Sequence, residues 1–249
     1  MKSTLSRKQR EVKEREGRIL ELAQQMIVQD GYHGLSMDRI AEALEYSKGT
    51  IYQHFSSKED ILMALVNQAM ECRLGLFRRA AAFRGRSRER ITAIGAAAEL
   101  FFQLYPDHFH IEHAVRITSI NQKVSEQRRR CLERCEASCS EVVLGVINDG
   151  VASGDLVLDG ELDAGQVGFG LWSLTFGGYS IAATSPSLRN LGIHDPIVAI
   201  RNNCNCLLDA LGWKPLAKDL DLPALMKRIQ SEVFAPELVE LTVRTTRGA

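Results

Sequence analysis

The chain has 249 residues, of which 45% are hydrophobic and 25% are charged, and this composition excludes an intrinsically disordered protein. Its 31 basic residues balance 31 acidic ones, so the formal net charge is zero and does not indicate a nucleic-acid partner. Aromatic residues make up only 6% and there are six prolines, which disfavours an all-β fold. We therefore expect an all-α protein with one large domain or two smaller ones.

Positive charge is concentrated locally at the N-terminus. Residues 1–18 carry seven basic side chains against three acidic ones. The basic residues are Lys2, Arg7, Lys8, Arg10, Lys13, Arg15 and Arg18. We predict that these residues form a basic arm that precedes the first helix and binds phosphate groups. The alternative is a solvated, frayed terminus.

The charged N-terminus lacks the apolar stretch of an export signal, so we expect a cytoplasmic protein whose six cysteines are thiols. Residues 164–188 form an uncharged run long enough to span a bilayer. Four glycines between residues 168 and 178 and several hydroxyl and amide residues interrupt this run. It therefore predicts a buried helix at a subunit interface and no contact with a membrane.

Two short helices are predicted near the N-terminus. Apolar spacing first indicates an amphipathic helix over residues 14–30, which ends at Gly31. Ser36 stands where an N-cap is expected for a second helix over residues 37–44. Ser47 can cap a third, polar on its outer face, and a fourth begins after Ser57 with a capping box completed by Asp60.

The rest of the chain keeps the helical pattern, with glycines and prolines marking the breaks. The further helices are predicted over residues 87–104, 107–119, 122–152, 161–183 and 196–211, with two short ones after residue 221.

A short helix, a tight turn and a capped second helix with a polar outer face are the specification of a helix-turn-helix. The segment from Gly34 to Leu62, GLSMDRIAEALEYSKGTIYQHFSSKEDIL, closely resembles the N-terminal signature of TetR-family transcriptional regulators. The resemblance implies an all-α fold with a DNA-binding head over residues 1–60 and an effector-binding and dimerisation body over residues 61–249. It also implies a homodimeric repressor that a small-molecule effector releases from a double-stranded DNA operator, with no catalytic activity and no cofactor.

The same resemblance implies which side chains contact DNA. Lys48 and Gln53 would read bases in the major groove, and Gly49 would permit close approach of the backbone. Ser47 and Thr50 would also face the major groove. The other positions would contact phosphates or the sugar-phosphate backbone. The predicted contacts are Ser36, Arg39, Ser47, Lys48, Gly49, Thr50, Tyr52, Gln53, His54 and Lys58, and Lys48, Thr50, Gln53 and His54 are expected to point outward.

The body carries no motif of comparable specificity. Aromatic residues at helical spacing are candidates for an apolar effector pocket, although core packing is the alternative for each. These candidates are Phe101, Phe102, Tyr105, Phe109, Trp172 and Phe176. Residues 161–183 and 196–211 are the candidates for a four-helix bundle between two subunits.

Two further clusters contain residues that can bind metal. One comprises His108, His110 and His113 with Glu112, and the other comprises Cys131, Cys135 and Cys139. We expect structural burial and no metal for both, because three thiols in line on one helix need a ligand from another element. A metal or redox sensor stays open as an alternative, while a Cys/His enzyme has no nucleophile-base spacing to support it.

Overall fold

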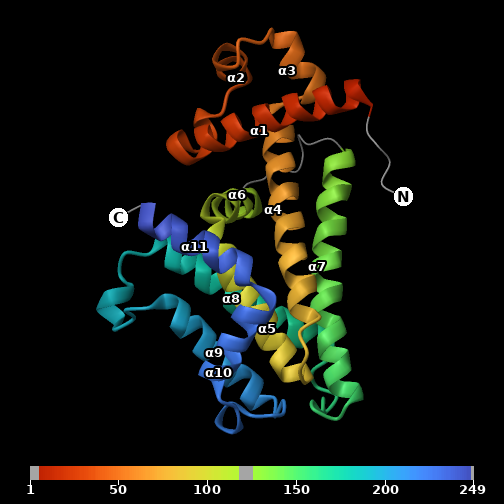
Figure 1. Ribbon diagram of the computed structural model, residues 1–249, viewed down its shortest axis with the longest axis vertical. Helices are drawn as coiled ribbons and strands as arrows, with labels where there is room; N and C mark the ends of the chain where they lie inside the picture. The colour runs from red at the N-terminus through yellow and green to blue at the C-terminus, as the bar shows by residue number, and fades with distance from the viewer. Residues whose placement is uncertain (1–5, 118–125, 248–249) are drawn as a thin grey trace. The chain divides into compact units, whose positions relative to one another are not determined.

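The computed structural model describes residues 6–117 and 126–247, and all regular secondary structure in these ranges is helical (Figure 1). The expected all-α fold is confirmed. The principal helices are α1 (Arg7–Gly34), α2 (Met37–Ala43), α3 (Lys48–His54), α4 (Lys58–Ala81), α5 (Ser87–Leu104), α6 (Pro106–Ile117), α7 (Glu126–Ala152), α8 (Ala164–Thr184), α9 (Pro196–Ala210), α10 (Leu222–Val233) and α11 (Ala235–Arg247). Predicted residues 118–119 and 122–125 lie outside the described ranges.

Helix α1 begins seven residues earlier than the sequence analysis predicted. Ser6 caps it, because the Gln9 amide donates to the Ser6 hydroxyl (3.2 Å) and the Ser6 amide donates to the Gln9 side chain (2.8 Å). The prediction of an arm before the helix is therefore wrong for residues 7–18, which form the first turns of α1. The helical path breaks at Gly31, where φ is +70°.

The chain divides into two compact units. The first contains Met1–Glu71 and Asp107–Cys135, and the second contains Cys72–Pro106 and Glu136–Ala249. Helices α4 and α7 each begin in the first unit and end in the second. The functional division at residue 60 stays a prediction.

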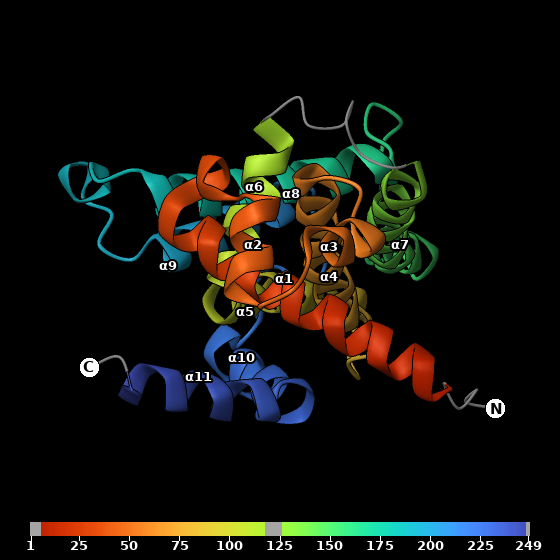
Figure 2. The same cartoon turned by 90° about the horizontal axis from the view of Figure 1, so that it is seen from above.

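The core of the first unit is built from the apolar faces of its short and long helices. Ile19 and Ala23 of α1, Ile40 of α2 and Ile51 of α3 are fully buried, and Figure 2 shows these three helices together. Burying one such aliphatic side chain contributes about 1.5–3 kcal/mol. This packing fixes α2 and α3, which have only seven residues each and are too short to be stable alone.

In the second unit a buried polar network joins α5 to the segment that follows α9. The guanidinium of Arg88 is fully buried and donates to the Trp213 carbonyl (3.0 Å) and to the Asp209 carboxylate (2.9 Å). The Trp213 indole donates to Ser87 (2.9 Å), whose hydroxyl donates to Asp155 (2.9 Å). These hydrogen bonds offset part of the desolvation of the buried groups, although Nε of Arg88 is buried without a hydrogen-bond partner among the described residues.

Helices α8 and α9 pack closely within the second unit. A Cβ on Gly178 would lie 2.6 Å from the Ile200 side chain, so the close approach requires glycine there. Nearby, the Phe102 ring stacks on Tyr179 with centroids 4.8 Å apart. None of the helices in residues 6–117 and 126–247 combines the length and apolarity needed to cross a bilayer.

Candidate nucleic-acid interface

Helices α2 and α3 form a helix-turn-helix. Residues 44–47 join them, with Glu45 in the left-handed region at φ +54°. The Tyr46 amide donates to the Ala41 carbonyl (2.9 Å) and closes the turn. The inner faces of both helices are buried, so the opposite face of α3 is directed to solvent.

Ser47 fixes the start of α3. Its hydroxyl accepts a hydrogen bond from the Thr50 amide (3.1 Å) and lies 2.8 Å from the Thr50 hydroxyl. The predicted N-cap is confirmed.

The outer face of α3 is polar and exposed. Lys48, Gly49, Tyr52 and Gln53 are all solvent-exposed, and 53% of the Tyr52 surface is accessible despite its large ring. The Lys48 ammonium contacts the Asp38 carboxylate at 2.8 Å, and this hydrogen bond raises the Lys48 pKa. Because both partners are exposed, the ion pair is weak and a phosphate can displace it.

His54 does not point outward as predicted. Only 8% of its side chain is exposed, and its Nδ1 lies 3.6 Å from the Glu16 carboxylate of α1. The prediction was wrong because helical spacing places His54 beside Phe55 but cannot show that α1 crosses this end of α3. His54 thereby connects the last turn of α3 to α1.

Ser36 and Arg39 flank the start of α2. Ser36 occupies the N-cap position, but its hydroxyl makes no capping bond, contrary to the expected cap. Its carbonyl accepts from the Ile40 amide (3.1 Å). Arg39 donates to Asp30 and to the Gly34 carbonyl, both at 2.8 Å, which holds α2 against the end of α1.

Lys58 opens α4 next to the end of α1. Its ammonium lies 4.4 Å from the centre of the Tyr32 ring, a cation–π contact. The Tyr32 hydroxyl donates to Glu59 (2.8 Å), and burial together with that carboxylate raises the pKa of Tyr32 to about 12. The phenol therefore stays protonated at neutral pH and keeps this link between α1 and α4.

Ser57 caps α4 through its hydroxyl, which accepts from the Asp60 amide (3.1 Å). The predicted capping box is only half formed, because Asp60 turns to Ser56 and accepts from its amide (3.3 Å) and hydroxyl (2.9 Å).

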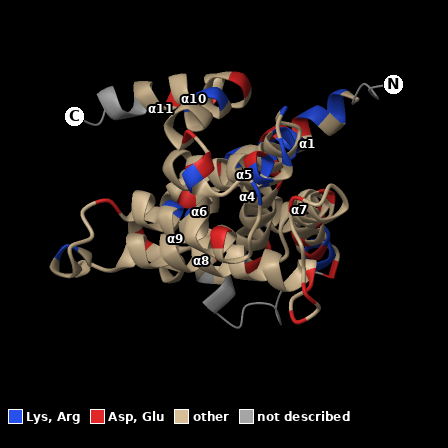
Figure 3. Ribbon diagram, turned by 90° about the horizontal axis from the view of Figure 1, so that it is seen from below, with Lys and Arg blue, Asp and Glu red and all other residues tan. Residues whose placement is uncertain are grey.

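Basic side chains extend along the exposed N-terminal half of α1 (Figure 3). Arg7 pairs with Glu11 one turn on, and Arg18 donates to the Tyr46 hydroxyl (3.3 Å) in the turn of the helix-turn-helix. Helix α1 thus adds positive charge to the unit that contains α3.

The predicted effector residues separate into distinct groups. Phe101 is buried beneath Arg73, Phe102 stacks on Tyr179, and the Phe101 and Tyr105 ring centroids are 5.7 Å apart. Trp172 and Phe176 lie on α8 with Phe169, where Trp172 is 46% exposed and Phe169 is 64% exposed. Phe109 belongs to the other compact unit and stacks on His113.

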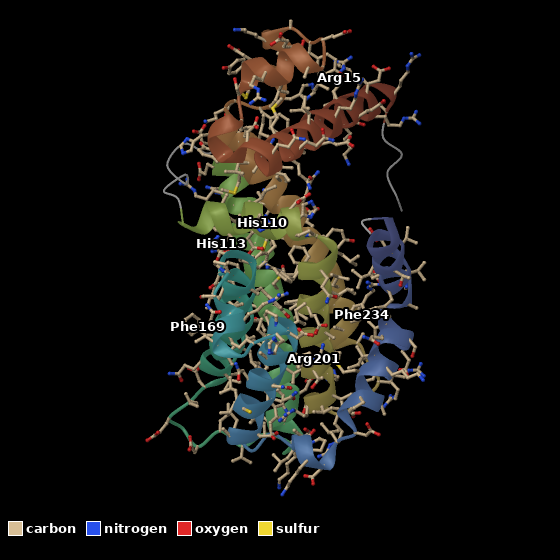
Figure 4. The ribbon with its side chains drawn as sticks, turned by 90° about the vertical axis from the view of Figure 1, so that its left-hand side faces the viewer. Arg15, His110, His113, Phe169, Arg201 and Phe234 are labelled. Carbon is tan, nitrogen blue, oxygen red and sulfur yellow. The ribbon has the colours of Figure 1, made fainter. Side chains whose placement is uncertain are left out.

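The histidine and cysteine clusters have different outcomes. Among the described residues, the group of three metal-ligating side chains whose ligand atoms approach one another consists of Glu71, Cys131 and Cys135. Cys139 is buried and belongs to the second unit, and the histidines of α6 (Figure 4) are not part of this group. Sequence reasoning missed Glu71, because no local spacing relates it to residues sixty positions away.

A hollow of about 400 Å³ lies between α1 and α6 in the first unit. Its lining is mostly polar and includes none of the predicted effector residues. The lining residues are Glu21, Gln24, Gln25, Val28, Gln29 and Asp107.

Comparisons with known proteins agree with this geometry. A family model described as "Bacterial regulatory proteins, tetR family" matches residues 19–65. The HTH-type transcriptional activator FasR of Mycolicibacterium smegmatis is 30% identical over 136 residues, which cover 54% of this chain and 59% of FasR. The fatty acid metabolism regulator protein of Bacillus subtilis is 28% identical over 195 residues, which cover 71% of this chain and 94% of that protein.

The fold is also similar to a solved structure, that of the fatty acid degradation regulator FadR from Bacillus halodurans. Its TM-score is 0.61 at 16% identity, and the superposition covers 85% of this chain and 100% of FadR. At that identity the likeness concerns the fold alone. The match to FasR spans less than two thirds of that relative's length.

The capping role of Ser47 predicts a specific pattern of stability. Ser47→Ala should lower the free energy of unfolding by about 1 kcal/mol, because the Thr50 amide loses its acceptor. Ser47→Asp should retain the native value, since aspartate caps equally well. Urea unfolding at one protein concentration measures both, and an alanine variant as stable as the parent would contradict the cap.

Proposed function

We propose that this chain, which belongs to the TetR family of helix-turn-helix transcriptional regulators, binds operator DNA by laying α3 in the major groove. The proposal rests on the exposed polar face of α3. The opposite face of this helix is buried, the Ser47 cap fixes its start and the His54–Glu16 contact fixes its end. Residues 1–60 would form the DNA-binding domain, and residues 61–249 the effector-binding and dimerisation domain.

The exposed residues of α3 divide by chemistry. Lys48 and Gln53 have the donors that match base edges in the major groove, where a lysine pairs with guanine and a glutamine with adenine. Gly49 leaves room for close approach to the DNA, and Tyr52 supplies a phenol for the backbone. Ser47 and Thr50, at the start of α3, are proposed to face the major groove beside Lys48. Outside α3, Ser36, Arg39 and Lys58 are proposed to hold phosphates.

His54 has a different role in this proposal. Its contact with Glu16 fixes the angle between α1 and α3, so it positions the reading helix. The basic side chains on α1 are proposed to extend the phosphate-binding surface. Substitution of these residues by uncharged ones tests this role better than deletion of residues 7–18. Removing residues 7–18 would also remove Glu16.

Lys48→Ala should weaken binding to duplexes selected from a random pool. If Lys48 neutralises a phosphate, the slope of log affinity against log salt should become less steep by about one. If it reads a base, discrimination at one position should fall by about 1–3 kcal/mol. Fluorescence anisotropy at several salt concentrations separates the two roles.

The matched control is Lys227→Ala, which removes an equally exposed lysine from α10. It should leave affinity and slope unchanged. Unchanged operator affinity in Lys48→Ala would remove Lys48 from the interface. Failure of the parent chain to enrich any duplex sequence would remove the proposed function itself.

We further propose that α8 and α9 form a homodimer interface. Helix α8, on which Phe169 is labelled in Figure 4, has no charged residue. Phe169, Trp172 and Ile181 expose 64%, 46% and 54% of their surfaces in the single chain. Exposed aromatic side chains at helical spacing are typical of a surface that a partner covers. A second copy would place its α8 and α9 against these helices as a four-helix bundle.

Trp172→Glu should convert the dimer to a monomer, because it places a charge in an apolar interface. Light scattering after size exclusion measures the mass, and circular dichroism checks that the helices persist. Val157→Glu changes a residue that is 77% exposed outside both helices and should remain dimeric. A dimer in Trp172→Glu with unchanged dissociation constant would place the interface elsewhere.

The proposed regulation is repression relieved by a small-molecule effector. Effector binding in the body would favour a dimer whose heads no longer match successive major grooves, which are about 34 Å apart. Two of the compared proteins are named as regulators of fatty acid metabolism and degradation, so fatty acids and their coenzyme A thioesters are the first class to test. Phe101, Phe102 and Tyr105 are the proposed apolar contacts, with Phe176 of the same unit less central. Trp172 is assigned to the dimer interface.

Addition of a long-chain fatty acid or its thioester to the operator complex should release DNA, since the effector binds the two dimer states unequally. The measurement is anisotropy of labelled operator during the titration. Phe102→Ala should raise the half-release concentration several-fold if this ring contacts the ligand. Tight effector binding by calorimetry with no change in operator affinity would contradict the coupling.

A further inference from the structure

Three metal-ligating side chains meet where α4 and α7 pack in the first unit. Glu71 comes from α4, and Cys131 and Cys135 come from successive turns of α7. One ligand atom from each lies within 4.8 Å of the other two. Glu71 is exposed and both thiols are half-buried, so an ion can enter from solvent.

We propose that Glu71, Cys131 and Cys135 bind a divalent ion of the zinc type, with water as the fourth ligand. Two thiolates and a carboxylate suit a borderline-soft ion, and three protein ligands with one open position are an established zinc arrangement. Zinc–sulfur bonds of about 2.3 Å and zinc–oxygen bonds of about 2.0–2.2 Å require ligand atoms about 3.5–3.8 Å apart in a tetrahedron. The three ligand atoms therefore need to approach one another by about 1 Å, which rotation of the side chains can provide.

The carboxylate distinguishes this group from ordinary core packing. Two half-buried thiols on one helix face need no partner, since free cysteine packs as a small hydrophobe. A disulfide between Cys131 and Cys135 would also not explain why the Glu71 carboxylate lies beside them. Binding would replace two thiol protons by one divalent ion. Of the three arginines just upstream of Cys131 on α7, Arg128 is paired with Asp60 and Arg130 with Glu126.

The same face of α7 contacts the DNA-reading helix. Arg128 precedes Cys131 by one turn, and its guanidinium lies 4.8 Å from the centre of the Phe55 ring, at the C-terminal cap of α3. It also lies 3.5 Å from the Asp60 carboxylate, and its carbonyl accepts from the Asn67 amide (3.4 Å). An ion bound between α4 and α7 would therefore restrain the contact between α7 and the C-terminal end of α3. This consequence for DNA rests on the proposed function, whereas the metal site does not.

The test of the site uses the full chain, reduced and freed of metal with a chelator. Cobalt(II) is the probe, because thiolate coordination gives a near-ultraviolet charge-transfer band and tetrahedral geometry gives strong visible absorption. One cobalt per chain should bind, and zinc should displace it. Cys131→Ser and Cys135→Ser should each weaken binding by at least about tenfold and reduce the charge-transfer band. Glu71→Gln should weaken binding while the band persists.

Two exposed residues provide matched controls. Cys206→Ser removes a thiol from α9, and Glu133→Gln removes a carboxylate from α7 between the two cysteines. Both should bind cobalt as the parent does. Circular dichroism establishes that each variant is folded. Absence of a thiolate band in the parent, or a band unchanged in Cys131→Ser and Cys135→Ser, would overturn the site.

Operator binding provides a separate readout. Zinc should change the operator affinity of the parent and leave that of Cys131→Ser unchanged. Cobalt coordination without any DNA binding would retain the metal site and reject the proposed function. Operator binding that does not respond to zinc in a chain with confirmed cobalt coordination would reject the coupling through Arg128.

Discussion

A seven-residue helix cannot maintain its own conformation in water, and the proposed DNA-reading surface of this protein is a helix of that length. Helix α3 is therefore only as well defined as the contacts that surround it. Ile51 and Phe55 are 0% and 1% exposed, and their burial supplies most of the free energy that keeps α3 helical. The Ser47 cap adds a smaller local contribution at the first turn.

The two ends of α3 are held differently. The start is fixed by residues next to it in sequence, whereas the end is fixed by distant helices. His54 contacts Glu16 of α1, and Phe55 lies beneath Arg128 of α7. A shift of α1 or of the start of α7 would therefore change the surroundings of the last turn of α3.

The apolar surface of α8 and the buried aromatic residues of α5 serve different purposes in this scheme. Exposed rings at Phe169 and Trp172 favour an interface with a second copy, while the buried Phe101 and the Phe102–Tyr179 stack belong to the interior of the second unit. Trp172, Phe101 and Phe102 were grouped from the sequence as candidates for one pocket, because aromatic residues at helical spacing could line it. Spacing places a residue on a helix face but does not say what that face meets.

Local features could be predicted from the sequence. Helix periodicity and the Ser47 cap depend on residues within a few positions of one another, so they were predicted correctly. The helix-turn-helix was recognised for the same reason. The outer face of α3 was predicted correctly for Lys48 and Gln53 but not for His54. The early start of α1 was also a local signal, Ser6 with Gln9, and it was missed because the basic side chains suggested an arm.

What only the tertiary structure decided are the contacts between residues distant in sequence. The side chain of His54 is buried against α1, and Phe109 lies in a different compact unit from the other candidate aromatics. The side chain that lies beside Cys131 and Cys135 is Glu71 and not the expected Cys139. No periodicity encodes these pairings, because they depend on which helix faces pack together across the fold. The sequence by itself determined the helices and the reading head, and tertiary packing determined which side chains meet.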